Sequence, residues 1–197
     1  EHYAYFLAWT GANVNGEDAR RVGLIDYLIN NDQQEAVIDA ITSHAWEGDA
    51  ATALDQLLDT FVQTSSDFPP SQLAMHDQII SETVTIALAS DNPVGIFLEQ
   101  CEKLGGDKWL ERAAATFKSG TPTTAAIIYE QIQRAKSMTR EQIFAMELTL
   151  AIQCSRHADF REGIRALLIE KDNTPNWQYK MGAVPNEWVA AHFAEPW

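Results

Sequence analysis

Three cationic residues near the C-terminus are spaced closely enough to contact one phosphorylated ligand. Arg161, Arg165 and Lys171 lie within eleven residues, in the stretch DFREGIRALLIEKDNTPNW at positions 159–177. Arginine and lysine side chains are common protein contacts to phosphate groups. Lys171 also lies at the expected end of a helix, where the helix dipole favours a cation without any ligand. The spacing alone therefore leaves two interpretations, a phosphate contact and a helix-end cation.

The histidines and cysteines predict neither a metal site nor a nucleophile. Cys101 and Cys154 share no C-x-x-C spacing, and both lie in apolar helical contexts that favour reduced, buried thiols. The chain has no G-x-S-x-G, P-loop or G-x-G-x-x-G motif. No H-E-x-x-H motif or other metal-ligand spacing joins the five histidines, which are His2, His44, His76, His157 and His192.

The carboxylate of Glu147, which lies inside an apolar helical pattern, is a candidate general acid or base. Glu147 has no second carboxylate or histidine at a spacing that would pair with it. We therefore expect it to form an ion pair with Arg140 or Arg156, or to cap a nearby backbone group. No residue of this chain is predicted to be catalytic, and no metal ligand is predicted.

The distribution of charge excludes one class of partner. The formal net charge of the 197 residues is −14 at pH 7. Residues 1–100 contain two cations, Arg20 and Arg21, and 16 acids, whereas residues 101–197 contain 12 of each. A phosphate-rich polymer would be repelled by the first half and not attracted by the second, so we expect no nucleic-acid partner. The apolar runs are far shorter than the ~18–20 residues that span a bilayer, so no membrane partner is expected.

Hydrophobic periodicity predicts a mainly helical chain with a substantial core, because 46% of its residues are hydrophobic. Leu54, Leu57, Leu58 and Phe61, for example, recur at the three- and four-residue spacing of a helix face. The stretch SSDFPP at residues 65–70 is a predicted loop and a candidate lobe boundary. Helix starts are predicted at Asn92-Pro93, Asp107, Thr121-Pro122, Thr139 with Gln142, and Asp159 with Glu162.

A single segment departs from the helical pattern. The sequence LIDYLI, residues 24–29, combines β-branched and aromatic residues between Gly23 and two asparagines, which predicts one short strand. A lone strand cannot satisfy its own backbone groups. We therefore expect this strand to pair with polypeptide outside the 197 residues.

Several segments resemble the crotonase (enoyl-CoA hydratase/isomerase) superfamily, in order along nearly the whole chain. YFLAWTGANVNGEDARRVGLIDYLI, SGTPTTAAIIYEQI and MELTLAIQC each resemble a family segment, whereas residues 30–118 match only loosely. Within the family, the branch that hydrolyses acyl-CoA thioesters has the more similar C-terminal segment. Its C-terminal pattern is met at Glu162, Gly163, Arg165, Ala166, Leu168, Ile169, Lys171, Asp172, Pro175 and Trp177.

The resemblance implies that this chain is the helical C-terminal lobe of an α/β crotonase fold. Residues 1–30 would end the crotonase core, residues 31–120 would form a helical segment of the lobe, and residues 121–197 would form the C-terminal helices and tail. The family's oxyanion-binding backbone groups and its Glu and Asp would precede residue 1. The implied activity is hydrolysis of an acyl-CoA thioester by the full-length protein, in the cytoplasm of a bacterium or the mitochondrial matrix.

The resemblance also implies the binding partners. An acyl-CoA would be the substrate, with no cofactor besides the coenzyme A that the substrate carries. Lys171 would contact a CoA phosphate or the adenine side, and Arg165 and Trp177 are weaker candidates for CoA binding. The lobe builds oligomer contacts in many relatives, which leaves a homo-oligomer open. Two alternatives remain, an enoyl-CoA hydratase or isomerase and a non-catalytic structural or binding module.

Overall fold

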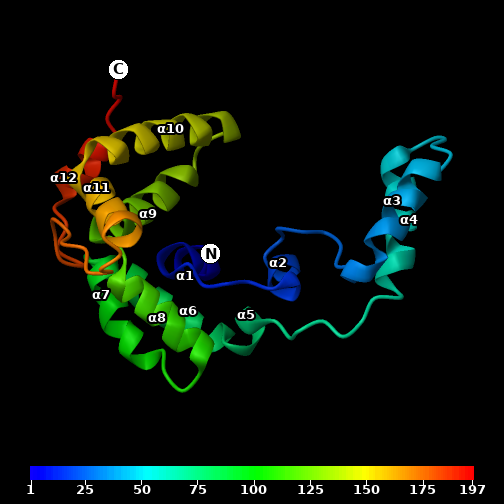
Figure 1. Cartoon of the computed structure of the whole chain (residues 1–197), viewed down its shortest axis with the longest axis horizontal. Coiled ribbons are helices and arrows are strands. Elements are labelled where there is room, and N and C mark those ends of the chain that lie inside the picture. Colours follow the sequence, from blue (N-terminus) through cyan, green and yellow to red (C-terminus); the bar gives the residue numbers. More distant parts are fainter. The chain divides into compact units, whose positions relative to one another are not determined.

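The computed structural model describes all residues from Glu1 to Trp197 and contains helices and loops only (Figure 1). By contacts the chain divides into two compact units. The larger combines residues 1–12 with residues 78–197, and the smaller is residues 13–77. No helix is both long enough and apolar enough to cross a bilayer. The division of this chain into residues 1–30, 31–120 and 121–197, predicted from the family resemblance, stays a prediction.

The larger unit gathers its helices around the first one. In chain order they are α1 His2–Thr10, α6 Asp77–Leu88, α7 Pro93–Gln100, α8 Lys108–Ser119, α9 Pro122–Ala135, α10 Arg140–Arg156, α11 Ala158–Ile164 and α12 Asn186–His192. A short 3₁₀ turn, Cys101–Lys103, follows α7, and a π-helical turn, Arg165–Ile169, continues α11. Helix α1 packs against both α8 and α9, so the chain start and the C-terminal half share one core.

Aromatic side chains form the centre of that core. Tyr5 and Phe6 of α1 are completely buried, and Trp9 nearly so. The Trp9 ring lies 4.8 Å from that of Phe97, which lies 4.9 Å from that of Phe117. The indole nitrogen of Trp9 also donates to the backbone oxygen of Ala125 at 3.0 Å. Because full burial of a large apolar side chain contributes about 1.5–3 kcal/mol, this cluster is the main source of stability in the unit.

Residues 182–189, which belong to the larger unit, contact its other helices in two regions. Val189 of α12 packs with Ile127 of α9 and Leu150 of α10. Further back, Gly182 lies against the backbone of Gly95 in α7, where a Cβ on Gly182 would come within 2.6 Å of the Gly95 Cα. The second contact leaves no room for a side chain at Gly182, whose φ of +76° also favours glycine.

The smaller unit is held by polar contacts. Its elements are α2 Gly16–Arg21, the 3₁₀ turn Asn31–Gln33, α3 Gln34–Ser43, α4 Ala50–Val62 and α5 Gln72–Met75. The buried carboxylate of Asp18 accepts hydrogen bonds from the Ser71 hydroxyl at 2.6 Å, the Leu73 backbone nitrogen at 2.9 Å and the Asn15 backbone nitrogen at 3.0 Å. This one side chain therefore joins α2 to the start of α5.

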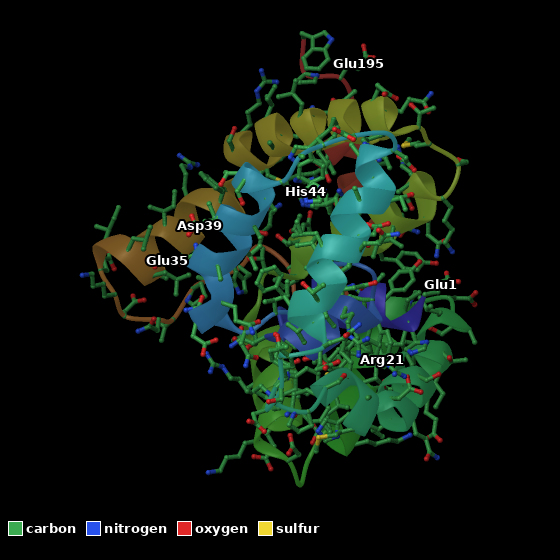
Figure 2. All side chains as sticks on the ribbon, turned by 90° about the vertical axis from the view of Figure 1, so that its right-hand side faces the viewer. Glu1, Arg21, Glu35, Asp39, His44 and Glu195 are labelled. Carbon is green, nitrogen blue, oxygen red and sulfur yellow. The ribbon has the colours of Figure 1, made fainter.

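Helices α3 and α4 pair as a hairpin that buries no side chain completely. Ile38 is 51% exposed and Trp46 is 41% exposed. Glu35 and Asp39 project from α3, and His44 follows its end (Figure 2). The hairpin therefore has an apolar seam that is only half covered and an acidic outer surface.

The predicted strand at residues 24–29 is wrong. These residues form bends and extended loop, with no ladder of backbone hydrogen bonds. Side chains supply contacts in place of a partner strand, because the Tyr27 hydroxyl donates to Asp55 at 2.5 Å and the Asn30 backbone nitrogen donates to the Ser65 hydroxyl at 3.0 Å. β-Branched and aromatic composition favours a strand only where a neighbouring strand is present, and the chain contains none.

Most predicted helix starts are confirmed. Asn92 caps α7 ahead of Pro93, Asp107 caps α8, and Thr139 with Gln142 forms a reciprocal capping box on α10. Helix α9 begins at Pro122 as expected, although Thr121 makes no side-chain cap. The predicted Asp159 cap on α11 is wrong, because the N-cap residue is His157 and the Asp159 carboxylate is bound elsewhere.

Candidate functional site

The candidate site is a cavity of about 730 Å³ inside the larger unit. One wall is the turn from α8 into α9, residues 116–124. The opposite wall is α11 with the loop that follows it to Trp177, and the ends of α10 and α12 close one side. The structure thus brings together the segments SGTPTT and DFREGIRALLIEKDNTPNW, which lie about forty residues apart in the sequence.

Asp159 is the residue that joins the two walls. It is 9% exposed, and its carboxylate accepts from the Thr123 hydroxyl of α9 at 2.7 Å and from the Gln178 backbone nitrogen at 2.9 Å. Both carboxylate oxygens are therefore engaged in holding α9, α11 and the following loop together. The sequence predicts only a helix cap for Asp159. Its actual partners, Thr123 and Gln178, are 36 and 19 residues away, and no local pattern indicates them.

Trp177 forms part of the wall. Its ring faces Gly163 of α11, where an added Cβ would lie 3.4 Å from the indole, and its nitrogen is 3.4 Å from the Ser119 backbone oxygen. Trp177 therefore packs the turn against α11, and its contact with CoA stays a prediction.

Two histidines form another side of the cavity. The His157 and His192 rings lie 4.2 Å apart, and His192 is almost completely buried. The His192 Nδ1 lies 2.8 Å from the Trp188 backbone oxygen, to which only a protonated nitrogen can donate. Burial lowers the pKa of His157, and the neighbouring His192 lowers it further. The lowered pKa favours a neutral His157 ring in the wall of the cavity.

The two thiols have no reactive environment. Burial raises the pKa of Cys101 to about 11 and raises that of Cys154, which lines the cavity. A thiol is nucleophilic as the thiolate, which a raised pKa disfavours. Both cysteines are free; Cys101 is buried as predicted, whereas Cys154 is only half-buried.

Arg165 lies outside the cavity and is surrounded by carboxylates. Its guanidinium donates to Glu162 at 2.7 and 2.9 Å, to Asp172 at 2.6 Å, and also to Glu170. A further contact reaches the Thr174 backbone oxygen at 3.3 Å. Hydrogen bonds from Arg165, and then from the Asn176 backbone nitrogen, lower the pKa of Glu162 to about 2. These groups, here named the Arg165 cluster (Glu162, Arg165, Glu170 and Asp172), fold the loop back onto α11.

Lys171 follows the π-helical turn and is exposed to solvent. Its backbone is in the left-handed region with φ of +55°, as is that of Asn173. Its ammonium group forms no ion pair or hydrogen bond, although carboxylates flank it on both sides in the sequence. Neither Lys171 nor Arg165 lines the cavity, and their predicted contacts with CoA stay predictions.

The lining of the cavity offers no free carboxylate and no activated thiol. Its only carboxylate, Asp159, is already bonded on both oxygens. The predicted ion pair of Glu147 is wrong, because that side chain accepts from Gln131 at 3.3 Å while Arg156 donates to the Pro196 backbone oxygen. No group of three or more His, Cys, Asp or Glu residues is arranged to hold a metal ion.

Comparison with known proteins places the chain in context. A family model described as Enoyl-CoA hydratase/isomerase matches residues 1–193. The 3-hydroxyisobutyryl-CoA hydrolase, mitochondrial, of Danio rerio is 28% identical over 173 residues, which cover 88% of this chain and 44% of the relative. The protein of the same name in Homo sapiens is 28% identical over 177 residues with the same coverage. The chain thus spans less than half the length of these relatives.

Solved structures show the same fold. A carnitinyl-CoA dehydratase from Mycobacterium thermoresistibile superposes with a TM-score of 0.73 at 23% identity, over 98% of this chain and 54% of that one. An enoyl-CoA hydratase from Rhodobacter sphaeroides superposes with a TM-score of 0.71 at 22% identity, over 99% of this chain and 55% of that one. At this identity the likeness concerns the arrangement of the helices and says nothing of the substrate.

Proposed function

Because the chain belongs to the enoyl-CoA hydratase/isomerase family, we propose that it is the C-terminal portion of an acyl-CoA thioester hydrolase, acting on 3-hydroxyisobutyryl-CoA in valine catabolism. One observation carries the proposal above the others. The two segments that resemble the family, at residues 119–132 and 159–177, face each other across one apolar cavity. The similarity to 3-hydroxyisobutyryl-CoA hydrolases over 88% of the chain supports the choice of substrate.

In this proposal the chain contributes binding and shielding, and the reacting groups belong to the part of the relatives' length that it does not span. Thioester hydrolysis needs donors that stabilise the developing oxyanion and a carboxylate that activates water or carries the acyl group. The helices would cover the acyl group and keep bulk water away, which strengthens the electrostatic interactions inside the site. Asp159 and Trp177 would act indirectly, by holding the two cavity walls in place.

Coenzyme A would be recognised through its phosphates. Lys171 is the proposed contact, since its ammonium group is exposed and unpaired. Arg165 belongs to the same region of the surface, but its guanidinium is already bonded to three carboxylates. The proposal requires no cofactor besides the CoA of the substrate, and it places the protein in the bacterial cytoplasm or the mitochondrial matrix.

The test is a substrate panel on the full-length gene product, with release of free CoA as the measurement. We expect hydrolysis of 3-hydroxyisobutyryl-CoA and little or no release from crotonyl-CoA. The 197-residue chain alone is the matched control and is expected to be inactive. Equal release from both thioesters, or no release from either, would contradict the proposed activity.

A second candidate function is a hydratase or isomerase of the same family. It is favoured by the description of the family model, which names that chemistry rather than hydrolysis. In the same panel this function predicts that crotonyl-CoA is consumed without release of CoA. The loss of the enoyl absorbance measures that consumption. A third possibility, a non-catalytic crotonase-like module, predicts that neither reaction occurs and that an acyl-CoA, if bound, is recovered intact.

A further inference from the structure

Helix α10 packs against the rest of the larger unit with one face only. Leu150 is buried, and Met146 and Cys154 are partly buried against the cluster that it forms with Ile127 and Val189. The opposite face is exposed to solvent from the first turn of the helix to the last. The helix has 17 residues and is about 25 Å long, so a long strip of its surface has no packing partner within this chain.

The exposed face carries large apolar side chains in its first half and small ones in its second half. Phe144 and Leu148 are 64% and 56% exposed. Ala151 and Ser155, which are also exposed, follow on the same side of the helix, because steps of three and four residues return to one face. Contiguous exposed apolar surface of this kind marks an interaction site.

The charges at the two ends of the face follow a similar order. Glu141 lies in the first turn of α10 and Arg156 is its last residue, and both are exposed. Arg156 uses one terminal nitrogen to donate to the Pro196 backbone oxygen at 3.1 Å. The face is therefore acidic at its start and basic at its end, which matches the polarity that the helix dipole favours.

We propose that the exposed face of α10 is a homodimer interface, in which two copies of the chain pair their α10 helices antiparallel about a twofold axis. With the axis between positions 148 and 149, Phe144 of each copy fits between Ala151 and Ser155 of the other, and Glu141 of each copy meets Arg156 of the other. The inference goes beyond the proposed function and does not depend on it, since it involves neither the cavity nor a ligand.

The order of side chains along α10 indicates a second copy as the occupant. Reversing the direction of the helix exchanges its large and small residues and its acidic and basic ends, so each feature meets its complement in another copy of the same face. A parallel pair would place Phe144 against Phe144 and Glu141 against Glu141. A membrane surface is disfavoured, because Glu141 and Glu147 border the face and an anionic bilayer would repel them.

One carboxylate opposes the pairing and limits its strength. Glu147 accepts from Gln131 of α9 at 3.3 Å, which holds it at the edge of the face. In the proposed dimer the two Glu147 side chains lie near the axis on the same side, where like charges repel. A contact between two single helices is also smaller than a standard interface, so we expect a weak dimer with Kd on the order of 10 μM.

The first test is sedimentation equilibrium of the full-length gene product and of two truncation variants. Phe144→Ala should raise the dimer Kd about 30-fold, because it removes the central apolar contact twice. Ile86→Ala is the matched control, since it shortens an exposed apolar side chain of α6, and it should leave Kd unchanged. Melting temperatures of both variants should stay close to that of the unmodified protein. Absence of a dimer at the highest soluble concentration, or equal effects of the two variants, would overturn the proposal.

Charge reversal tests the antiparallel arrangement. Glu141→Arg and Arg156→Glu each place like charges at both ends of the interface, so each should raise Kd about tenfold. Mixed in equal amounts, the two variants should pair with each other about as tightly as the unmodified protein, because each supplies the charge that the other lacks. Such rescue by mixing requires position 141 to meet position 156 of the other copy. Its absence would overturn the proposed pairing.

The position of Glu147 near the twofold axis gives a third measurement. Glu147→Gln removes the repulsion between the two copies and should lower Kd about threefold at low salt. A higher Kd for this variant would contradict the register of the two helices. All these association constants are measured without substrate, so the inference can fail while thioester hydrolysis is observed, and it can hold where hydrolysis is not.

Discussion

The core around α1 and the hairpin of α3 and α4 both contain helices with apolar side chains but differ in what covers those side chains. Around α1, helices α8 and α9 pack on the helix, and Tyr5 and Phe6 are completely buried. In the hairpin, two helices face only each other, and no side chain reaches full burial. Helix α1 is apolar around most of its circumference, whereas α3 and α4 each have one apolar face, so burial follows the packing partners that each helix has. Local stability is therefore expected to be high in the larger unit and low in the hairpin.

The largest effect is expected from removing an aromatic side chain from the α1 core. Phe97→Ala should lower the free energy of unfolding of the larger unit by about 3–5 kcal/mol, because it leaves a cavity among Phe6, Trp9 and Phe117. The matched variant in the hairpin, Leu57→Ala, should cost only about 1 kcal/mol, since that side chain is partly exposed already. Urea unfolding followed by hydrogen exchange of each unit measures both. Similar losses in the two units would contradict the contrast.

An intermediate effect is expected at the polar anchor of the smaller unit. Asp18→Ala leaves the Leu73 and Asn15 backbone nitrogens and the Ser71 hydroxyl without an acceptor, and should cost about 2–3 kcal/mol. Asp18→Asn keeps the shape and one acceptor oxygen, so it is the control and should lose less. Hydrogen exchange at α2 and α5 is the readout. A loss no larger than that of Leu57→Ala would show that the anchor is not the main support of this unit.

The smallest effect is expected on the pH dependence of stability, through the carboxyl group of Glu162. The pKa of Glu162 is lowered to about 2 in the folded chain, against an ordinary value of 4.5. A carboxyl with a depressed folded pKa stabilises the fold above its unfolded pKa, and that contribution is lost as pH falls from about 4.5 toward 2. Glu162→Gln should therefore flatten the decline in melting temperature over this range.

The hairpin supplies the contrast to this acid prediction. Residues 13–77 hold twelve acids and two cations, so protonation relieves repulsion there. Protection factors in α3 should accordingly rise or stay constant over the same pH range. Those at the start of α4 should fall, because hydrogen bonds from Thr52 and Ala51 lower the pKa of its capping residue Asp49, and protonation removes that cap. An unchanged pH profile in Glu162→Gln would contradict the role given to that carboxylate.

Local signals in the sequence predicted local structure well. Caps such as Asp107 and Thr139 involve residues two or three positions apart, so their partners can be identified from the sequence. The family resemblance likewise identified the fold, since its motifs at residues 159–177 are contiguous in the chain. The strand at residues 24–29 failed for a different reason: composition describes a preference, and a strand exists only with a partner.

The candidate site was less predictable, because its contacts join distant residues. The bond from Thr123 to Asp159 spans 36 positions, and no periodicity indicates it. One local pattern in the sequence does indicate a contact near the site. Glu162 and Arg165 have the i, i+3 spacing of a helical ion pair, which would have warned that the arginine is occupied. The contact of Trp177 with Gly163 likewise joins residues 14 positions apart, and only the tertiary structure reveals it.

The way α1 joins the C-terminal half has a practical consequence for protein engineering. Residues 13–77 interrupt a unit whose two pieces, residues 1–12 and 78–197, share one core. Because residues 1–12 and 78–197 make their core contacts with each other, that core does not require the side chains of the interrupting residues. A shortened version with a flexible linker in place of these residues should retain the aromatic core, whereas trimming the first ten residues should destroy it.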